Sequence, residues 1–143
     1  MRKTTVGIII LVISMILAFS SAMYRSQTAF RCNYDGTRII PVYEIEIRLK
    51  DGDTGRFCSV HCAKAWLQEN TSPVGSVIVT DEITGESLDS AIALFVESDV
   101  VTVKATQNRI HAFRDKSHAM SHAKQYNGRL VDNPFTSVDR MMD

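Results

Sequence analysis

The distribution of apolar and charged residues divides the chain into an apolar N-terminal segment and a mixed remainder. The seventeen residues from Val6 to Ala22 contain no charged side chain, and Arg2 and Lys3 precede them. An α-helix of that length spans about 25 Å, slightly less than the roughly 30 Å hydrocarbon core of a membrane. The pattern over residues 1–24 is typical of a membrane anchor or of a signal peptide, for which Ser20-Ser21-Ala22 offers a cleavage site.

Either form of this segment keeps the basic start in the cytoplasm and predicts that the remainder of the chain is exported. If the segment is retained, the protein is a single-pass protein of the cytoplasmic membrane with its domain on the periplasmic or extracellular side. If the segment is cleaved, the domain is released to the periplasm. A buried core helix is the weaker alternative, because nothing in the apolar run is amphipathic.

Alternating residues and turn residues predict a first unit of strand, strand, helix and strand over about residues 40–85. Val42 to Leu49 alternates apolar and polar positions, which indicates a strand with one buried face. Ser59 is expected to cap the helix. The other expected elements are the turn Lys50 to Gly55, the return strand Arg56 to Cys58, the helix from about Val60 to Glu69 and the strand Val77 to Thr80.

The same order is expected to recur over about residues 92–133. Extended segments from Ala93 to Thr106 are followed by a return strand, Ile110 to Phe113, by a helix that Asp115 caps, and by a short strand, "RLVD". The helix is expected from about Lys116 to Tyr126, with Asn127-Gly128 ending it. We therefore predict an α+β fold, a duplicated strand–strand–helix–strand domain over residues 25–135 behind the N-terminal helix, with the chain loose from Pro134 and a flexible tail over 136–143.

Composition excludes one class of partner and makes the cysteines conspicuous. The chain has 16 basic and 16 acidic residues and a net charge of zero, so its charge gives no reason to expect a nucleic-acid partner. It has three cysteines, an odd number for an exported protein, in which disulfides form readily. An odd number suits a site with three thiolate ligands better than a disulfide framework.

The cysteines follow the pattern C-x25-C-x3-C, formed by Cys32, Cys58 and Cys62. The last two lie on either side of an expected helix start, where unpaired backbone N–H groups favour thiolate. Three thiolates suit a soft metal ion such as Cu(I), with Zn(II) as the alternative. A fourth position can be filled by His61, Asp35, a distant methionine or solvent.

Other interpretations of these residues stay open at this point. Two cysteines can form a disulfide with the third buried, or one can be a catalytic thiol. His118 and His122 are four residues apart on the second expected helix and can share a metal or join the cysteine site, or they can be solvated residues of a helix face. His111 alternates with apolar residues and is interpreted as a plain strand residue.

The region from Cys32 to Trp66, "C…FCSVHCAKAW", resembles the TRASH-type metal-binding motif, a cysteine followed at some distance by C-x3-C. Over roughly residues 32–132 the chain resembles the NosL family, copper-binding accessory proteins of nitrous oxide reductase. The matching stretches include "ALFVESDVVT" and "IHAFRDKSHAMSHAKQYNGRLV". The resemblance implies a periplasmic or membrane-tethered Cu(I) carrier whose fold is similar to that of the organomercurial lyase MerB.

The sequence thus predicts a non-enzymatic protein that holds or delivers Cu(I) outside the cytoplasmic membrane. Its expected ligands are Cys32, Cys58 and Cys62, with His61, His118 and His122 as further contacts. The expected partners are the metal ion, a metalloenzyme or metal-transport client, and the membrane through the N-terminal helix. The alternatives are a structural zinc-binding interaction domain and a MerB-like thiol lyase, in which Asp115 or Asp35 supplies the proton.

Overall fold

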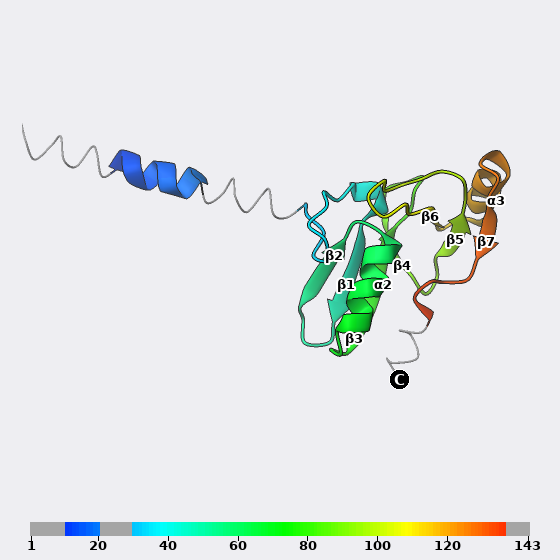
Figure 1. Cartoon of the computed structure of the whole chain (residues 1–143), viewed down its shortest axis with the longest axis horizontal. Coiled ribbons are helices and arrows are strands. Elements are labelled where there is room, and N and C mark those ends of the chain that lie inside the picture. The colour runs from blue at the N-terminus through cyan, green and yellow to red at the C-terminus, as the bar shows by residue number, and fades with distance from the viewer. Residues whose placement is uncertain (1–10, 21–29, 137–143) are drawn as a thin grey trace, which may run out of the picture. The chain divides into compact units, whose positions relative to one another are not determined.

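The computed structural model describes residues 11–20 and 30–136, and the chain separates into two compact units, Met1–Phe30 and Arg31–Asp143 (Figure 1). In the first unit, residues 11–20 form a helix with exposed side chains. Within the described parts of the chain, no helix combines the length and the apolar character needed to cross a membrane. The rest of the anchor or signal segment expected over 1–24, its end included, lies outside the described residues, as does most of the expected tail.

The first sheet of the second unit has four antiparallel strands in the order β2–β1–β3–β4. Alternation along β1 and β2 places Ile45, Ile47 and Phe57 on one buried face, and the helix α2 lies across the sheet (Figure 1). The Phe57 ring lies against Gly55, and a Cβ at Gly55 would come within 2.9 Å of the ring atoms. The centroid of the Phe57 ring is 5.3 Å from the centroid of the Trp66 ring on α2. The elements are β1 (Ile45–Leu49), β2 (Thr54–Phe57), α2 (Val60–Glu69), β3 (Val74–Thr80) and β4 (Ser87–Asp89).

The second sheet has three antiparallel strands in the order β6–β5–β7, and α3 packs against all three of them. Register pairs Val96 with His111 and Leu94 with Phe113, so these residues share a face, which Ala119 of α3 helps to cover. The elements are β5 (Leu94–Glu97), β6 (Ile110–Phe113), α3 (Lys116–Gln125) and β7 (Arg129–Val131).

Both halves therefore have the element order that the alternation predicted, strand, strand, helix and strand. In each half the first strand is central and the other two flank it, β1 between β2 and β3 and β5 between β6 and β7. Phe57 and Phe113 occupy equivalent strand ends and both are fully buried. β4 is an addition to the first half that the sequence did not predict.

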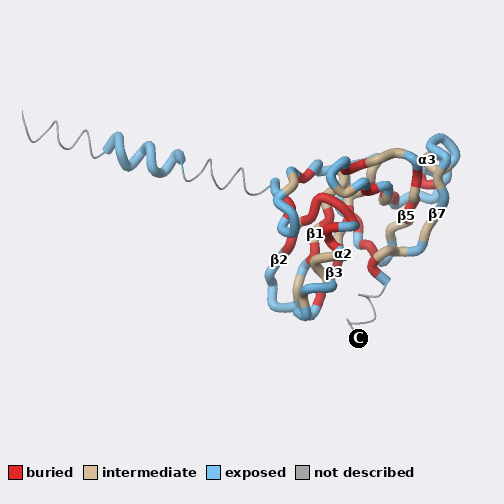
Figure 2. The backbone as a smooth tube through the Cα atoms, viewed as in Figure 1, coloured by how far each residue is buried: buried red, intermediate tan, exposed pale blue. Residues whose placement is uncertain are grey.

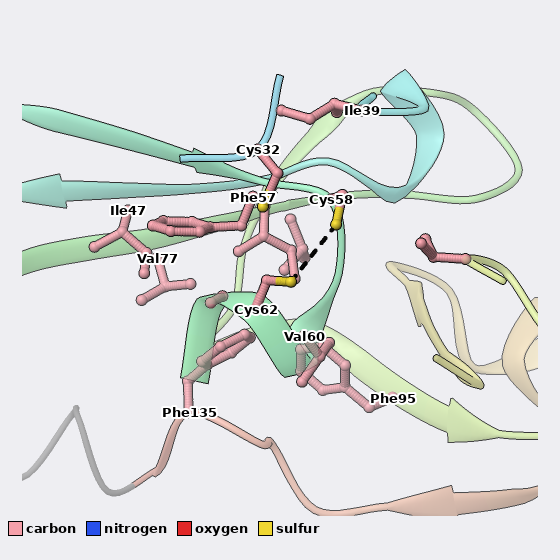
Figure 3. Packing of buried hydrophobic residues seen from close by; sticks show 14 of the residues in the cluster. Cys32, Ile39, Ile47, Phe57, Cys58, Val60, Cys62, Val77, Phe95 and Phe135 are labelled. Carbon is pink, nitrogen blue, oxygen red and sulfur yellow. Dashed lines mark hydrogen bonds between the residues drawn. The ribbon is translucent and has the colours of Figure 1, made fainter. Parts of the chain in front are cut away.

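Several local expectations are wrong. β2 spans Thr54–Phe57 rather than Arg56 to Cys58, because Thr54 and Gly55 pair with β1 instead of lying in the expected turn. β1 begins at Ile45 rather than at Val42, because the preceding residues form a 3₁₀ turn, η1 (Pro41–Tyr43), with proline at its first position. The chain is not loose from Pro134, because Phe135 is fully buried and packs against Phe95. Phe135 thereby joins the main apolar core, which draws on both sheets (Figure 3). Figure 2 shows how the buried residues are distributed along the backbone.

Candidate metal centre

The first cysteine is placed by a tight turn that is fastened to the edge of β2. The Cys32 amide donates to Thr37 O (2.8 Å) and the Gly36 amide donates to Cys32 O (2.9 Å), with Gly36 at φ +71°. This left-handed conformation favours glycine. Asn33 then forms two hydrogen bonds with Arg56 of β2, both 2.8 Å long. The Asn33 backbone amide donates to Arg56 O, and the Arg56 backbone amide donates to Asn33 Oδ1.

The other two cysteines are placed by the junction between β2 and α2. Cys58 directly follows β2, and Ser59 caps α2 as expected, accepting from the Cys62 amide at 3.3 Å. Cys58 and Cys62 are 0% and 1% exposed, and Cys32 is 4% exposed. Because Asn33 pairs with Arg56, two residues before Cys58, the turn that carries Cys32 is held beside this junction.

The structure brings the three cysteines together with Asp35. One donor atom from each of these four residues lies within 4.8 Å of all the others. The Cys58 and Cys62 sulfurs face each other at 3.7 Å (Figure 3), and all three cysteines are free thiols. A disulfide needs about 2.05 Å between the sulfurs, whereas two thiolates on one tetrahedral metal lie about 3.8 Å apart for metal–sulfur bonds of about 2.3 Å. The spacing fits a shared metal.

Asp35 is the exposed member of the cluster. Its Oδ2 is 3.3 Å from Cys62 Sγ and 4.0 Å from Cys58 Sγ. Partial burial works to raise the pKa of Asp35, but hydrogen bonds from Thr37 and from the Cys32 and Cys62 thiols outweigh it, so the pKa lies below its usual value. An ionised carboxylate therefore stands between the buried sulfurs and solvent.

The thiols themselves differ from the expectation that a helix start favours thiolate. Burial raises the pKa of Cys58 to about 11, and the adjacent Cys32 and Asp35 add to the effect. Burial also raises the pKa of Cys62, and the Asp35 carboxylate acts in the same direction, although the Ser59 side chain opposes it. Without a metal these thiols are protonated at neutral pH, because desolvation outweighs the field of the helix end.

The histidines expected as further contacts lie outside this cluster. His61 is exposed on α2, and among the described residues it belongs to no group of donors that can hold a metal. His118 is likewise exposed and outside such groups. His122 belongs to a second group, with His111 and Glu82.

Sequence reasoning missed His111 and Glu82. The signal for His111 was present, since alternation along β6 places it on the same buried face as Phe113, where a polar side chain needs a partner. Glu82 lies 29 residues earlier in the chain and carried no such signal.

Comparison with known proteins gives one informative match. No family model matches the chain, and no curated protein matches it by sequence. Among solved structures, the crystal structure of the copper chaperone NosL from Shewanella denitrificans is similar, with a TM-score of 0.62 and 23% identity over 73% of this chain and 87% of that one. The fold is NosL-like. The resemblance to NosL read from the sequence is thereby confirmed at the level of the fold, and the mixed α+β class with it.

Proposed function

We propose that this protein is a non-enzymatic metal carrier that holds Cu(I) at Cys32, Cys58 and Cys62 and delivers it to a metalloenzyme or a metal-transport client. The observation that carries the proposal is the convergence of three thiols from two distant segments, with a sulfur–sulfur spacing that suits one metal ion. Thiolates are the ligands that Cu(I) prefers. The NosL-like fold supports the proposal, because the similar protein is described as a copper chaperone.

The arrangement of the donors suits delivery as well as binding. The three sulfurs are buried, whereas Asp35 is exposed, so an incoming ligand from a client reaches the metal from the Asp35 side. A carboxylate is a poor ligand for Cu(I) and yields its place to a thiolate or thioether. Transfer then proceeds through a shared ion, with the client's ligand binding before the cysteines release.

We also propose that the domain acts outside the cytoplasmic membrane, tethered by the N-terminal segment or released from it. The support is the charge-free run from Val6 to Ala22 behind Arg2 and Lys3. A reporter enzyme that is active only after export, fused behind residue 136, is expected to be active. Activity of a cytoplasm-only reporter at the same position would contradict export.

The binding proposal is tested by titrating the reduced full chain with Cu(I) against a chromophoric Cu(I) chelator without oxygen. We expect one Cu(I) per chain. In Cys58→Ser/Cys62→Ser the affinity is expected to fall by more than the roughly 10- to 100-fold that follows from disturbing only a ligand's hydrogen-bond partner. His61→Gln, between the two cysteines and exposed, is the matched control and should bind as the unaltered protein does. Equal affinity in the double cysteine variant would overturn the site.

Asp35 favours a second candidate, a structural zinc-binding domain. Three thiolates and one carboxylate complete a tetrahedral set of the kind that holds Zn(II), and a closed site contributes to folding rather than to transfer. Asp35→Asn tests whether the carboxylate is a zinc ligand, because Zn(II) affinity is then expected to fall while Cu(I) affinity is kept. Zinc that survives dialysis, together with unfolding when a chelator removes it, would favour the structural role over the carrier.

The cluster also bears on the thiol-lyase alternative. Of the two acids considered for that chemistry, Asp35 contacts the thiols, whereas Asp115 caps α3 and is not in the cluster. The lowered pKa of Asp35 keeps it ionised, which is the wrong state for a proton donor. We therefore expect pure protein to cleave no carbon–mercury bond.

A further inference from the structure

A second group of metal-binding side chains lies in the NosL-like domain and shares no residue with the cysteine cluster. It consists of Glu82, in the turn after β3, His111 on β6 and His122 on α3. One donor atom from each lies within 4.8 Å of the other two. Three separate elements thus contribute one donor each.

His111 is oriented as a metal-binding histidine usually is. Its side chain is fully buried, with Nδ1 at 2.6 Å from Glu82 Oε2 and Nε2 at 3.3 Å from the Val100 carbonyl oxygen and 3.0 Å from Ser98 Oγ. Histidines that bind metals typically donate the N–H of one ring nitrogen to a carbonyl or a carboxylate and bind through the other nitrogen. Without a metal, Nδ1–H donates to the Glu82 carboxylate. When the proton is on Nε2 instead, directed at Val100 O, Nδ1 is free to bind a metal beside Glu82.

His122 brings the second imidazole to the same place. Its ring centroid is 4.2 Å from that of His111, and its Nε2 is 3.3 Å from Ser98 Oγ, so that this hydroxyl lies beside both rings. His122 and Glu82 also line an open cleft of about 450 Å³ whose wall includes Tyr43 and Tyr126. The donors therefore lie between the buried face of the second sheet and solvent.

We propose that Glu82, His111 and His122 form a second metal site, selective for a borderline divalent cation such as Zn(II). Two imidazoles and one carboxylate are a donor set found for Zn(II), and they leave a fourth position open, here toward the cleft, for water or a carboxylate. They lack the sulfur that Cu(I) prefers. The domain then carries two sites of opposite preference, a soft one at the start of α2 and a harder one between β6 and α3.

Binding needs only a small rearrangement. Nitrogen and oxygen ligands on one tetrahedral metal lie about 3.3 Å apart for bonds of about 2.0–2.1 Å, so Glu82 must withdraw from its 2.6 Å contact with His111. The Glu82 side chain is 17% exposed and sits in a turn, which leaves it room to move while His111 stays packed. The competing explanation is that the three residues form only a hydrogen-bonded network that stabilises the fold.

The test is calorimetric titration with Zn(II) of the full chain carrying Cys32→Ser/Cys58→Ser/Cys62→Ser, which removes the soft site whether or not that site carries Cu(I). We expect one Zn(II) per chain, and at least about 10-fold weaker binding when His122→Gln is added. His61→Gln, exposed on α2 and outside the group, is the matched control and should bind as its parent does. Absence of Zn(II) binding by the folded cysteine-free chain, or equal binding by the two histidine variants, would overturn the site.

A second measurement covers the case in which the cysteine-free chain fails to fold. Co(II) is added to the protein with all its cysteines, where sulfur ligands give intense charge-transfer absorption and nitrogen and oxygen ligands give only the weaker visible bands. We expect a Co(II) spectrum component without sulfur charge transfer that His122→Gln removes and His61→Gln keeps. A spectrum that is the same in both histidine variants would show that the group is a structural network.

Discussion

At the scale of single residues, buried polar groups in this protein are held by several partners at once. Asp81 is 1% exposed, and its oxygens accept from the backbone amides of Ile83 (3.0 Å), Thr84 (2.8 Å) and Arg114 (2.6 Å). Burial works to raise the pKa of Asp81, but these hydrogen bonds lower it overall. Asp81 fixes the turn that carries Glu82 and ties it to the chain between β6 and α3.

The variant Asp81→Asn tests this role. One oxygen can still accept from Ile83 and Thr84, but the new amide nitrogen faces the Arg114 N–H, so two donors meet and one stays unsatisfied in a buried place. We expect the free energy of unfolding in urea to fall by roughly 1–3 kcal/mol. Asp89→Asn, at the exposed last residue of β4, whose side chain accepts from one amide, should change it far less. Equal midpoints for the two variants would contradict the assigned role.

The composition of the cysteine cluster could be predicted from the sequence, but its surroundings could not. The spacing of Cys58 and Cys62 across a helix start brings their side chains together by local geometry alone. Cys32 joins them through Asn33, which pairs with Arg56 at 23 residues' distance, and only the folded chain shows such pairing. For the same reason the role of His111 was not predicted, because its partner Glu82 is distant in sequence and lies in the turn after β3 of the other sheet. The raised pKa of the thiols was missed because it depends on burial.

At the scale of elements, the starts of α2 and α3 are set by their caps. α2 begins after Ser59 and α3 after Asp115, as predicted from the sequence. The Asp115 side chain accepts from the Ser117 hydroxyl and, at 2.7 Å, from the Ser117 amide, and these bonds lower its pKa. The C-terminal end of α3 has Asn127 at φ +50°, and the Gly128 amide donates to Ala123 O at 2.7 Å, which satisfies a carbonyl of the last turn.

Asp115 predicts a dependence of stability on pH. Because its folded pKa is below the usual 3.8, its contribution to stability is complete above that value and is lost as pH falls through the lowered folded value. Asn caps helices as well as Asp does, so Asp115→Asn should match the unaltered protein at pH 7 and lose less stability below about pH 4. Urea unfolding midpoints of both proteins measured from pH 7 to pH 2 check this. An equal fall of the two midpoints as pH decreases would contradict the prediction.

Elements with strong local signals were predictable, and short ones were not. The bounds of α2 and of β6 match the prediction because a cap or an uninterrupted run marks them. β4 is three residues long with one buried side chain, Leu88, which is too short a pattern to recognise. β3 begins at Val74, three residues before the expected start, because its pairing with Leu49 of β1 extends it.

At the scale of the whole domain, the two sheets share one core rather than forming separate halves. Phe95 of β5 and Phe135, beyond β7, belong to the same buried cluster as Ile47 and Phe57 of the first sheet. The second half keeps only a small cluster of its own, Val96, Phe113 and Ala119. The residues after β7 therefore close the core of the first half, and the domain is expected to unfold in one transition.

Phe135→Ala tests this closure. Removal of a fully buried phenylalanine is expected to cost about 3–5 kcal/mol of unfolding free energy, since it loses burial and leaves a cavity. We expect the unfolding midpoint to fall by the same amount whether it is measured by circular dichroism at a helix wavelength or by the fluorescence of Trp66, which lies in the first half. Leu130→Ala, at a residue of β7 that is 46% exposed, should have a much smaller effect. Separate transitions for the two signals would mean that the halves unfold independently.

The burial of the cysteine sulfurs has a consequence for the lifetime of the metal-free protein. Exchange with small disulfides such as oxidised glutathione begins with attack by a thiolate that the reagent can reach. Cys58 and Cys62 are screened from solvent and carry raised pKa values, so the reactive thiolate is scarce and hidden in the metal-free protein. In an oxidising compartment the empty protein would therefore keep its thiols, and binding of a soft ion would displace their protons and hold the sulfurs as metal ligands rather than as free nucleophiles.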